Sequence, residues 1–107
     1  MTIRRLPALT HERFVDHWST VHADLGSGVP GSESCRQVRT DAALMRPVAP
    51  ASGLGVVDLD GAALNYCSSP EAMLRILGDP DVSERPMADE RTFIDHGGSA
   101  MVCDWSR

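Results

Sequence analysis

The chain has 107 residues, of which 42% are hydrophobic and 23% charged, a composition typical of one soluble globular domain with a modest core. Fifteen acidic and ten basic residues give a formal net charge of -5, which argues against a nucleic-acid partner because such a partner requires a concentrated basic patch. No apolar run reaches the roughly 20 residues that cross a bilayer, and no signal-peptide pattern is present, so we expect a cytoplasmic protein without membrane contact.

The N-terminal half predicts a strand, a helix and a second strand. Residues 2–6 are expected to form a short strand, and Thr10 is a suitable N-cap for a helix over residues 10–25. A glycine-rich loop follows, and residues 33–41 predict the second strand. Residues 42–55 are rich in alanine, proline and glycine and predict a flexible surface connection that can act as a lid.

The C-terminal half predicts a strand, two helical stretches and a last strand. The apolar run 62–67 suits a central strand, and Ser69 caps a helix that ends at Gly78. A further helical stretch covers residues 81–94, and residues 99–105 alternate as a strand. The order of elements is that of a ferredoxin-like α+β fold with a four-stranded antiparallel sheet and helices on one face. The bare face of such a sheet commonly pairs with a second copy, which closes a dimeric α/β barrel around a ligand cavity.

His22 lies among the apolar residues of the first predicted helix. At about 100° per residue, Phe14 and Trp18 fall on one face of this helix, and His22 lies beside Trp18. Histidine is the side chain that changes charge near neutral pH, so a half-buried imidazole here is a candidate general acid or base. A core histidine with one hydrogen bond and no chemistry fits the same pattern.

The motifs give no support to metal or nucleotide chemistry. His17 and His22 lie five residues apart, about 140° around an α-helix, so they are not expected to share one ion. His11 and His17 are expected to be exposed helix residues, and neither a metal-ligand spacing nor a glycine-rich phosphate loop occurs. We therefore expect no metal and no cofactor. The cysteines are odd in number, widely spaced and expected to be buried, reduced and inert: Cys35, Cys67 and Cys103.

An acidic and aromatic set near the C-terminus offers partners for His22. Its members are Asp89, Glu90, Phe93, Asp95 and His96. A carboxylate is the usual partner that orients a histidine and fixes its tautomer, although a solvated acidic helix end gives the same pattern. Tyr66, on the predicted central strand, adds a phenol that can either pack or donate to a substrate oxygen.

Several short motifs follow one another along nearly the whole chain. In the N-terminal half they are Arg4-Arg5-Leu6-Pro7-x-Leu9-Thr10, Phe14-x3-Trp18-x3-His22-Ala23 and Pro30-Gly31. In the C-terminal half they are Asp60-Gly61, Ser69-Pro70-Glu71-Ala72 and Asp89-Glu90-x2-Phe93-Ile94-Asp95. Together, and in this order, they resemble the EthD-like family, whose members are dimeric α+β barrels of the ferredoxin-like type.

The resemblance implies a homodimer that acts without a cofactor on an aromatic or polyketide-like small molecule, in secondary metabolism. Characterised relatives include decarboxylases, cyclases, dehydratases and a methylmuconolactone isomerase, and others are accessory proteins in ether degradation. By resemblance, His22 is the catalytic general acid or base. Our own hypothesis adds Tyr66 or Asp95, which would hold the substrate oxygen or the imidazole. The expected substrate-binding residues are Phe14, Trp18, Asp89 and Phe93.

The chain departs from the family's pattern in three places. Its first strand is shorter, Leu64 and Tyr66 replace an acidic residue and a tryptophan, and residues 42–55 are unusually rich in alanine, proline and glycine. Without that acid, Asp95 or Tyr66 has to serve as the partner of the histidine.

Three functions stay open. The first is a lyase or isomerase, with a cofactor-free oxygenase of anthrone-type substrates as a closely related reaction. The second is a non-catalytic binding or accessory protein, and the third is a structural barrel dimer with a filled cavity.

Overall fold

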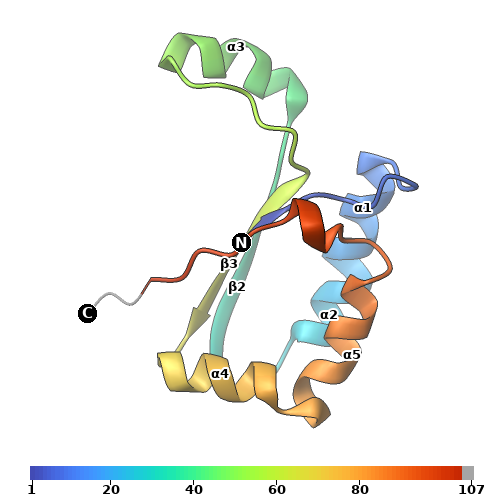
Figure 1. Cartoon of the computed structure of the whole chain (residues 1–107), viewed down its shortest axis with the longest axis vertical. Coiled ribbons are helices and arrows are strands. Elements are labelled where there is room, and N and C mark those ends of the chain that lie inside the picture. The colour runs from blue at the N-terminus through green and yellow to red at the C-terminus, as the bar shows by residue number, and fades with distance from the viewer. Residues whose placement is uncertain (105–107) are drawn as a thin grey trace.

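The structure, a computed structural model, describes residues 1–104 of the chain (Figure 1). In chain order its elements are β1 (Thr2–Ile3), α1 (His11–His17), the π-helical turn η1 (Trp18–His22), α2 (Ala23–Gly26), β2 (Ser32–Arg39), α3 (Ala42–Ser52), β3 (Gly61–Cys67), α4 (Pro70–Gly78), α5 (Pro80–Glu90) and the 3-10 turn η2 (His96–Gly98). The mixture of helices with an antiparallel sheet confirms the α+β class. None of the described helices has the length and apolar character that a membrane span requires.

The described sheet has three strands in the order β1-β3-β2, all antiparallel. β2 and β3 pair along their length, whereas β1 pairs with only the first two residues of β3. The prediction of a four-stranded sheet is therefore wrong for the described residues. A single bridge between Thr2 and Ala100 marks the edge where a fourth strand adds in the ferredoxin-like order. Because β1 offers only two residues as a template, residues 101–104 are not paired, and residue 105 of the predicted last strand lies outside the described residues.

A small apolar core lies between the sheet and the helices that cover one of its faces. Figure 1 shows α1, α2 and α5 together on that side, with α4 at one end of the sheet. The buried cluster consists of Ile3, Phe14, Trp18, Ala63, Phe93 and Ile94. The indole of Trp18 lies directly on Gly61, where an added Cβ atom would come within 2.6 Å of the ring. The other face of the sheet is bare, with Val38, Leu64 and Tyr66 exposed.

Residues 42–55, predicted as a flexible connection, contain a helix instead. α3 begins where the Asp41 side chain accepts two backbone N–H groups, and it ends at Gly53, whose φ of 77° is the left-handed conformation typical of a helix C-terminus. These two local end signals outweigh the prolines inside the segment. We refer to residues 42–57 as the arm, because Figure 1 shows them projecting from the body of the molecule beyond the ends of β2 and β3.

The three cysteines are free thiols, but the prediction that all are buried is wrong. Cys35 and Cys103 are exposed, and Cys67 is half-buried. Cys35 lies on β2, an outer strand of the described sheet. Desolvation by the surrounding atoms nevertheless raises the pKa of the Cys35 thiol, which favours its protonated and less reactive form.

Candidate functional site

The helical segment that carries His17 and His22 is not a regular α-helix. α1 ends at His17, and the next five residues form the π-helical turn η1. A π-helical turn is wider than an α-helical turn and accommodates an additional residue, so residues five apart come toward one face. Gln37 on β2 supports the turn by donating from Nε2 to the carbonyl of Trp18 at 2.9 Å. The expected divergence of His17 and His22 is wrong because it assumed α-helical geometry throughout.

Both histidines contact the two oxygens of one carboxylate. His17 Nε2 lies 2.8 Å from Asp89 Oδ1, and His22 Nδ1 lies 3.0 Å from Asp89 Oδ2. Asp89 is in the last turn of α5, so these contacts join the two helices that cover the sheet. A carboxylate can only accept, and each nitrogen that faces it therefore donates. A neutral His22 then carries its proton on Nδ1 and has its lone pair on Nε2.

A second carboxylate extends this arrangement toward solvent. Glu90 Oε1 lies 3.8 Å from His22 Nε2, which is too far for a hydrogen bond, and Glu90 Oε2 lies 3.3 Å from His96 Nε2. The His22 side chain is 16% exposed, whereas that of His96 is 56% exposed. Acids and bases thus alternate from the surface inward. We call this set the histidine–acid cluster: His17, His22, Asp89, Glu90 and His96.

Phe93 fixes the histidine rings from the core side. Its ring centroid lies 4.8 Å from that of His17 and 5.0 Å from that of His22, which meets it edge-on. Phe93 in turn packs on Phe14, and Phe14 packs on Trp18, all three being buried. These three aromatic residues are therefore core residues that support the histidine–acid cluster. Direct contact between them and a substrate stays a prediction.

The other predicted catalytic residues lie apart from His22. Tyr66 is 54% exposed on β3. Asp95 follows α5, where its backbone N–H donates to the Arg4 carbonyl and its carboxylate lies against Gly98. Neither makes a hydrogen bond to His22 within the described residues. The partner of His22 is Asp89, which the sequence motif placed near the site as a substrate contact.

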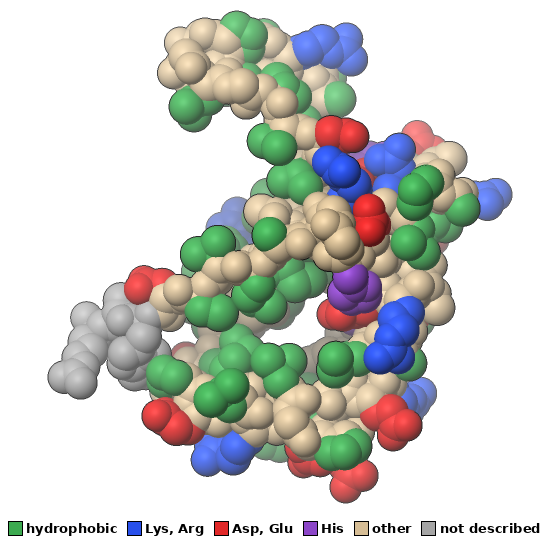
Figure 2. Space-filling model, in the orientation of Figure 1, with side chains coloured by type: hydrophobic (Ala, Val, Ile, Leu, Met, Phe, Trp, Pro, Cys, Tyr) green, Lys and Arg blue, Asp and Glu red, His purple; other side chains and the backbone are tan. Residues whose placement is uncertain are grey.

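A hollow of about 890 Å3 lies between β3, α4 and residues 101–104. Its lining includes Tyr66 and is mostly apolar, with Leu64, Met73, Leu74, Met101 and Val102. Among its described lining residues, the charged side chains are acidic, Glu33 and Asp104, and the N-terminal ammonium of Met1 is the positive group. Figure 2 shows a hollow in the middle of the molecule with apolar side chains around it and histidine and acidic side chains at one edge.

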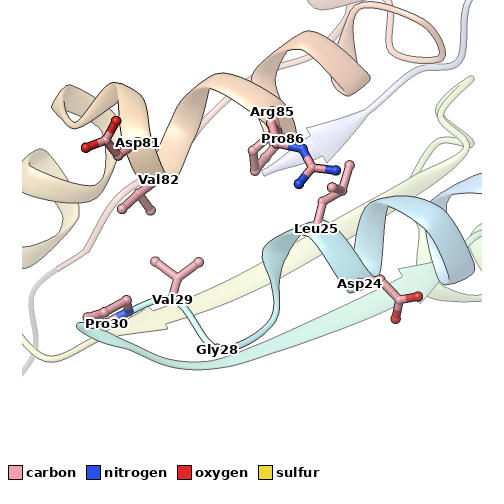
Figure 3. Close-up of a pocket in the computed structure, with 9 residues that line it drawn as sticks. All are labelled: Asp24, Leu25, Gly28, Val29, Pro30, Asp81, Val82, Arg85 and Pro86. Carbon is pink, nitrogen blue, oxygen red and sulfur yellow. The ribbon is translucent and has the colours of Figure 1, made fainter.

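A second hollow, of about 320 Å3, separates α5 from the loop that follows α2 (Figure 3). Val29 and Val82 face one another across it, and Arg85 points toward Leu25. His22 lines neither of these two hollows. In this single chain no member of the histidine–acid cluster is among the residues that line these two hollows.

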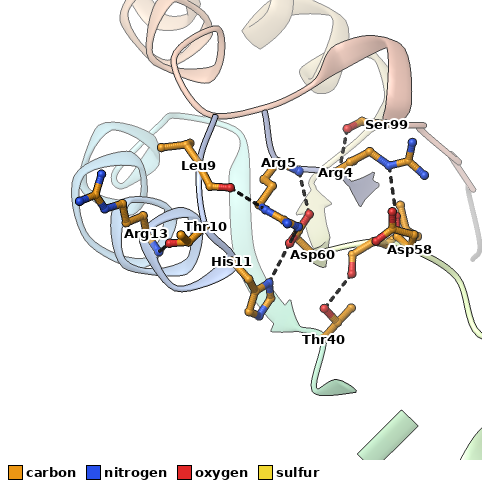
Figure 4. Close-up of polar contacts among 11 residues, drawn as sticks. Arg4, Arg5, Leu9, Thr10, His11, Arg13, Thr40, Asp58, Asp60 and Ser99 are labelled. Atoms are coloured by element: carbon orange, nitrogen blue, oxygen red, sulfur yellow. Dashed lines mark hydrogen bonds and ion pairs between the residues drawn. The ribbon is translucent and has the colours of Figure 1, made fainter. Parts of the chain in front are cut away.

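A separate polar cluster around Asp60 holds the ends of three elements together (Figure 4). The buried Asp60 carboxylate accepts from the backbone N–H and the guanidinium of Arg5 and contacts His11 Nδ1, each at 2.8 Å. Burial alone would raise the pKa of Asp60, but the hydrogen bonds from Arg5 and His11 outweigh it and lower this pKa below its ordinary value. His11, expected to be a simple exposed residue, thus has a structural partner.

The chain belongs to the EthD domain family, whose pattern matches residues 6–97. The match includes every member of the histidine–acid cluster and confirms the resemblance drawn from the short motifs. Together with the α+β fold, it places the chain in a family of small enzyme-like and small-molecule-binding proteins. A comparison with curated proteins gives no significant match.

Proposed function

We propose that this protein is a cofactor-independent lyase or isomerase in which His22 transfers a proton to or from an aromatic or polyketide-like substrate. One observation carries the proposal: Asp89 Oδ2 accepts from His22 Nδ1 at 3.0 Å, while His22 Nε2 makes no hydrogen bond to a described residue. A half-buried imidazole that is oriented by a carboxylate and keeps one nitrogen for the substrate is the arrangement that general acid–base catalysis requires.

The chemistry follows from this orientation. Nε2 accepts a proton from an enolisable carbon or a phenol, and the Asp89 carboxylate stabilises the imidazolium that forms. Return of the proton to another atom of the substrate completes an isomerisation, a cyclisation or a dehydration. In a decarboxylation, the carbanion left by the departing carbon dioxide takes its proton from His22. Such proton transfer accelerates a reaction by about 10²- to 10⁴-fold.

The hollow beside β3 supports the choice of substrate class. Its apolar side chains suit an aromatic ring or a polyketide chain, and Tyr66 offers a hydroxyl to a substrate oxygen. The acidic residues Glu33 and Asp104 outnumber the single N-terminal ammonium of Met1, so the net negative charge of the lining disfavours an anionic ligand. Cyclisation, dehydration and isomerisation of neutral ketones or phenols are therefore better supported than decarboxylation of a carboxylate. In this proposal Asp89 takes the role that the sequence assigned to Asp95.

A non-catalytic binding protein is the second candidate. It is favoured by the absence of His22 from the lining of the hollow, because a ligand held there has no contact with the histidine in the structure of the single chain. In that case the histidine–acid cluster joins η1 to α5 and has only a structural role.

A turnover screen without added cofactors tests both functions. Wild type, His22→Ala, Asp89→Asn and Asp81→Asn are incubated with poly-β-ketones, phenolic acids, anthrones and unsaturated lactones, and the products are followed by mass spectrometry. We expect turnover by wild type, a loss of about 10²- to 10⁴-fold in His22→Ala and a clear loss in Asp89→Asn. Asp81→Asn changes an exposed acid of the same helix and should retain full activity.

The outcomes separate the candidates. A reaction that His22→Ala carries out as fast as wild type contradicts the catalytic role of His22. Compounds that raise the melting temperature of all four proteins but are returned unchanged support the binding protein. A product that gains oxygen points to the anthrone-type oxygenase.

A further inference from the structure

Glu90 lies between a half-buried histidine and an exposed one. Its Oε1 atom is 3.8 Å from His22 Nε2, and its Oε2 atom is 3.3 Å from His96 Nε2. The three side chains come from three elements, η1, α5 and η2, and their exposed fractions rise in that order from 16% to 24% and 56%. A row of titratable groups therefore leads from the nitrogen that the proposed reaction uses to the surface of the molecule.

The bond between Glu90 and His22 depends on where the proton is. While His22 is neutral and donates from Nδ1 to Asp89, its Nε2 atom is an acceptor, and a carboxylate is an acceptor as well, so the two cannot bond. Once Nε2 receives a proton it becomes a charged donor, and a charged N–H group and a carboxylate approach to about 2.7–2.9 Å. The terminal torsion of a glutamate side chain is broad, so the carboxyl group can make this move. Glu90 is therefore placed to bond His22 after His22 has taken up a proton.

We propose that Glu90 and His96 form a proton relay between His22 Nε2 and water, which rests on the proposed function because Nε2 is there the atom that takes the proton of the substrate. First the Nε2–H bond of the imidazolium breaks and an O–H bond forms at Glu90 Oε1, which leaves a neutral imidazole and a carboxylic acid. A half-turn of the carboxyl group presents this proton to His96. His96 accepts it at Nε2 and releases the proton of its Nδ1 atom to water, so Glu90 returns to a carboxylate. The reverse steps bring a proton to His22.

The other carboxylate at His22 is unsuited to this transfer. Asp89 faces Nδ1 instead of Nε2, and its second oxygen contacts His17 Nε2. A proton placed on Asp89 would remove the acceptor that orients both imidazole rings. Phe93 packs on the core side of both rings. Among the ion pairs of residues 1–104, Glu90 is thus the acid that faces the reactive nitrogen.

The relay gives His22 a way to return to its starting state. A general base that keeps a proton after the product has left cannot begin another cycle, and a decarboxylation consumes one proton in each cycle. His22 is 16% exposed and Phe93 covers its core side, so its own access to water is restricted. His96 is the most exposed member of the histidine–acid cluster and is suited to exchange protons with water.

Proton exchange at the ring of His22 tests the relay without a substrate. Nitrogen-15 NMR at about pH 5–7, where histidine changes its charge, measures how fast the Nε2–H group exchanges with water. Glu90→Gln keeps the size of the side chain and its ability to accept a hydrogen bond, but an amide does not take up the proton. We expect exchange at least about tenfold slower in Glu90→Gln, and a smaller slowing in His96→Ala because a protonated Glu90 can still reach water. Glu84→Gln makes the same change at an exposed acid of α5 and should exchange like wild type.

The results separate the relay from the proposed function. Thermal melting first checks that each variant is folded. Exchange in Glu90→Gln as fast as in wild type overturns the relay, even if the wild type converts a compound of the turnover screen. Faster exchange in Glu90→Gln also overturns it, because Glu90 then shields Nε2 from water. Slower exchange in Glu90→Gln supports the relay, and if the wild type also converts no compound of the screen, it is the catalytic role of His22 that is contradicted.

Discussion

Asp60 illustrates how one buried carboxylate can fix several chain segments. It lies directly before β3, and its partners Arg5 and His11 lie after β1 and at the start of α1. Removing a carboxylate from water is costly, and the Arg5 and His11 contacts offset that cost only while they are all present. Loss of the charge therefore leaves Arg5 and His11 without their acceptor at the junction of three elements.

We expect acidification to remove the contribution of Asp60 to stability. Its pKa is lower in the folded chain than its ordinary value, so this contribution is complete above the ordinary value of 3.8 and is lost as the pH falls through the folded value. Asp60→Asn should lower the free energy of unfolding by roughly 1–3 kcal/mol at neutral pH and by much less in acid. Urea unfolding at about pH 7 and pH 3 measures both values. Asp58→Asn, at an exposed neighbouring carboxylate, is the control, and an equal loss at both pH values contradicts the prediction.

Gly61 supplies a second test of a single position. An added Cβ atom would lie 2.6 Å from Trp18 Cζ3 and 2.8 Å from the Val38 carbonyl oxygen, so the indole and the sheet have to separate. We expect Gly61→Ala to reduce the free energy of unfolding by about 1–3 kcal/mol. Gly55→Ala is the matched control, because no atom lies within 4 Å of its added Cβ. Equal stability of the two variants would show that the core tolerates the methyl group.

At the level of elements, η1 decides which side chains meet α5. His17 and His22 are five residues apart, yet the wide turn places them where residues four apart lie in an α-helix. The histidine–acid cluster therefore depends on one local change of helical geometry. Phe93 packs against both imidazole rings and stabilises their position.

Deletion of Ser19 should convert η1 to regular α-helix without separating the two histidines. The residue is exposed, and its removal leaves the histidines four apart on one face, so both contacts with Asp89 should persist. Nitrogen-15 shifts of the imidazole rings report these contacts through the tautomer of each histidine. Insertion of an alanine after Ser19 is the opposite change and should abolish the contact of His22. Loss of the contact in the deletion variant would refute this account of η1.

The elements that sequence reasoning predicted well have their signals in neighbouring residues. Thr10 and Ser69 cap the helices that follow them, as expected from their side chains. α3 also has local signals at Asp41 and Gly53, but the prediction rested on the alanine, proline and glycine content of the segment and did not use them. The fourth strand was predicted wrongly because its formation depends on the length of β1, a partner far away in the sequence.

In the histidine–acid cluster too, the residues with local sequence signals were predicted, and the residues whose position depends on the folded geometry were not. His22 was identifiable from its apolar neighbours, and the Asp89-Glu90 motif indicated the acidic side of the cluster. His17 was not identifiable, because α-helical periodicity places it on another face and only η1 brings it to Asp89. Asp95 was a reasonable partner by spacing, but it lies beyond the end of α5 and its carboxylate packs against Gly98.

At the level of the whole molecule, the chain is more extended than its length requires. Its radius of gyration is 14.9 Å, whereas a compact domain of this size has about 13 Å. The arm projects from the body of the molecule (Figure 2), and its α3 helix contributes no buried residue.

The shortness of β1 has a consequence for how the protein behaves in a crowded solution. Beyond Ala63, the edge of β3 that faces away from β2 has no strand beside it among the described residues. The segment there, from Leu64 to Cys67, contains no charge and no proline, two of the features by which proteins discourage edge-to-edge aggregation. Whatever covers this edge therefore protects solubility, and heating or dilution that uncovers it should lead to β-rich aggregates before the chain is fully unfolded.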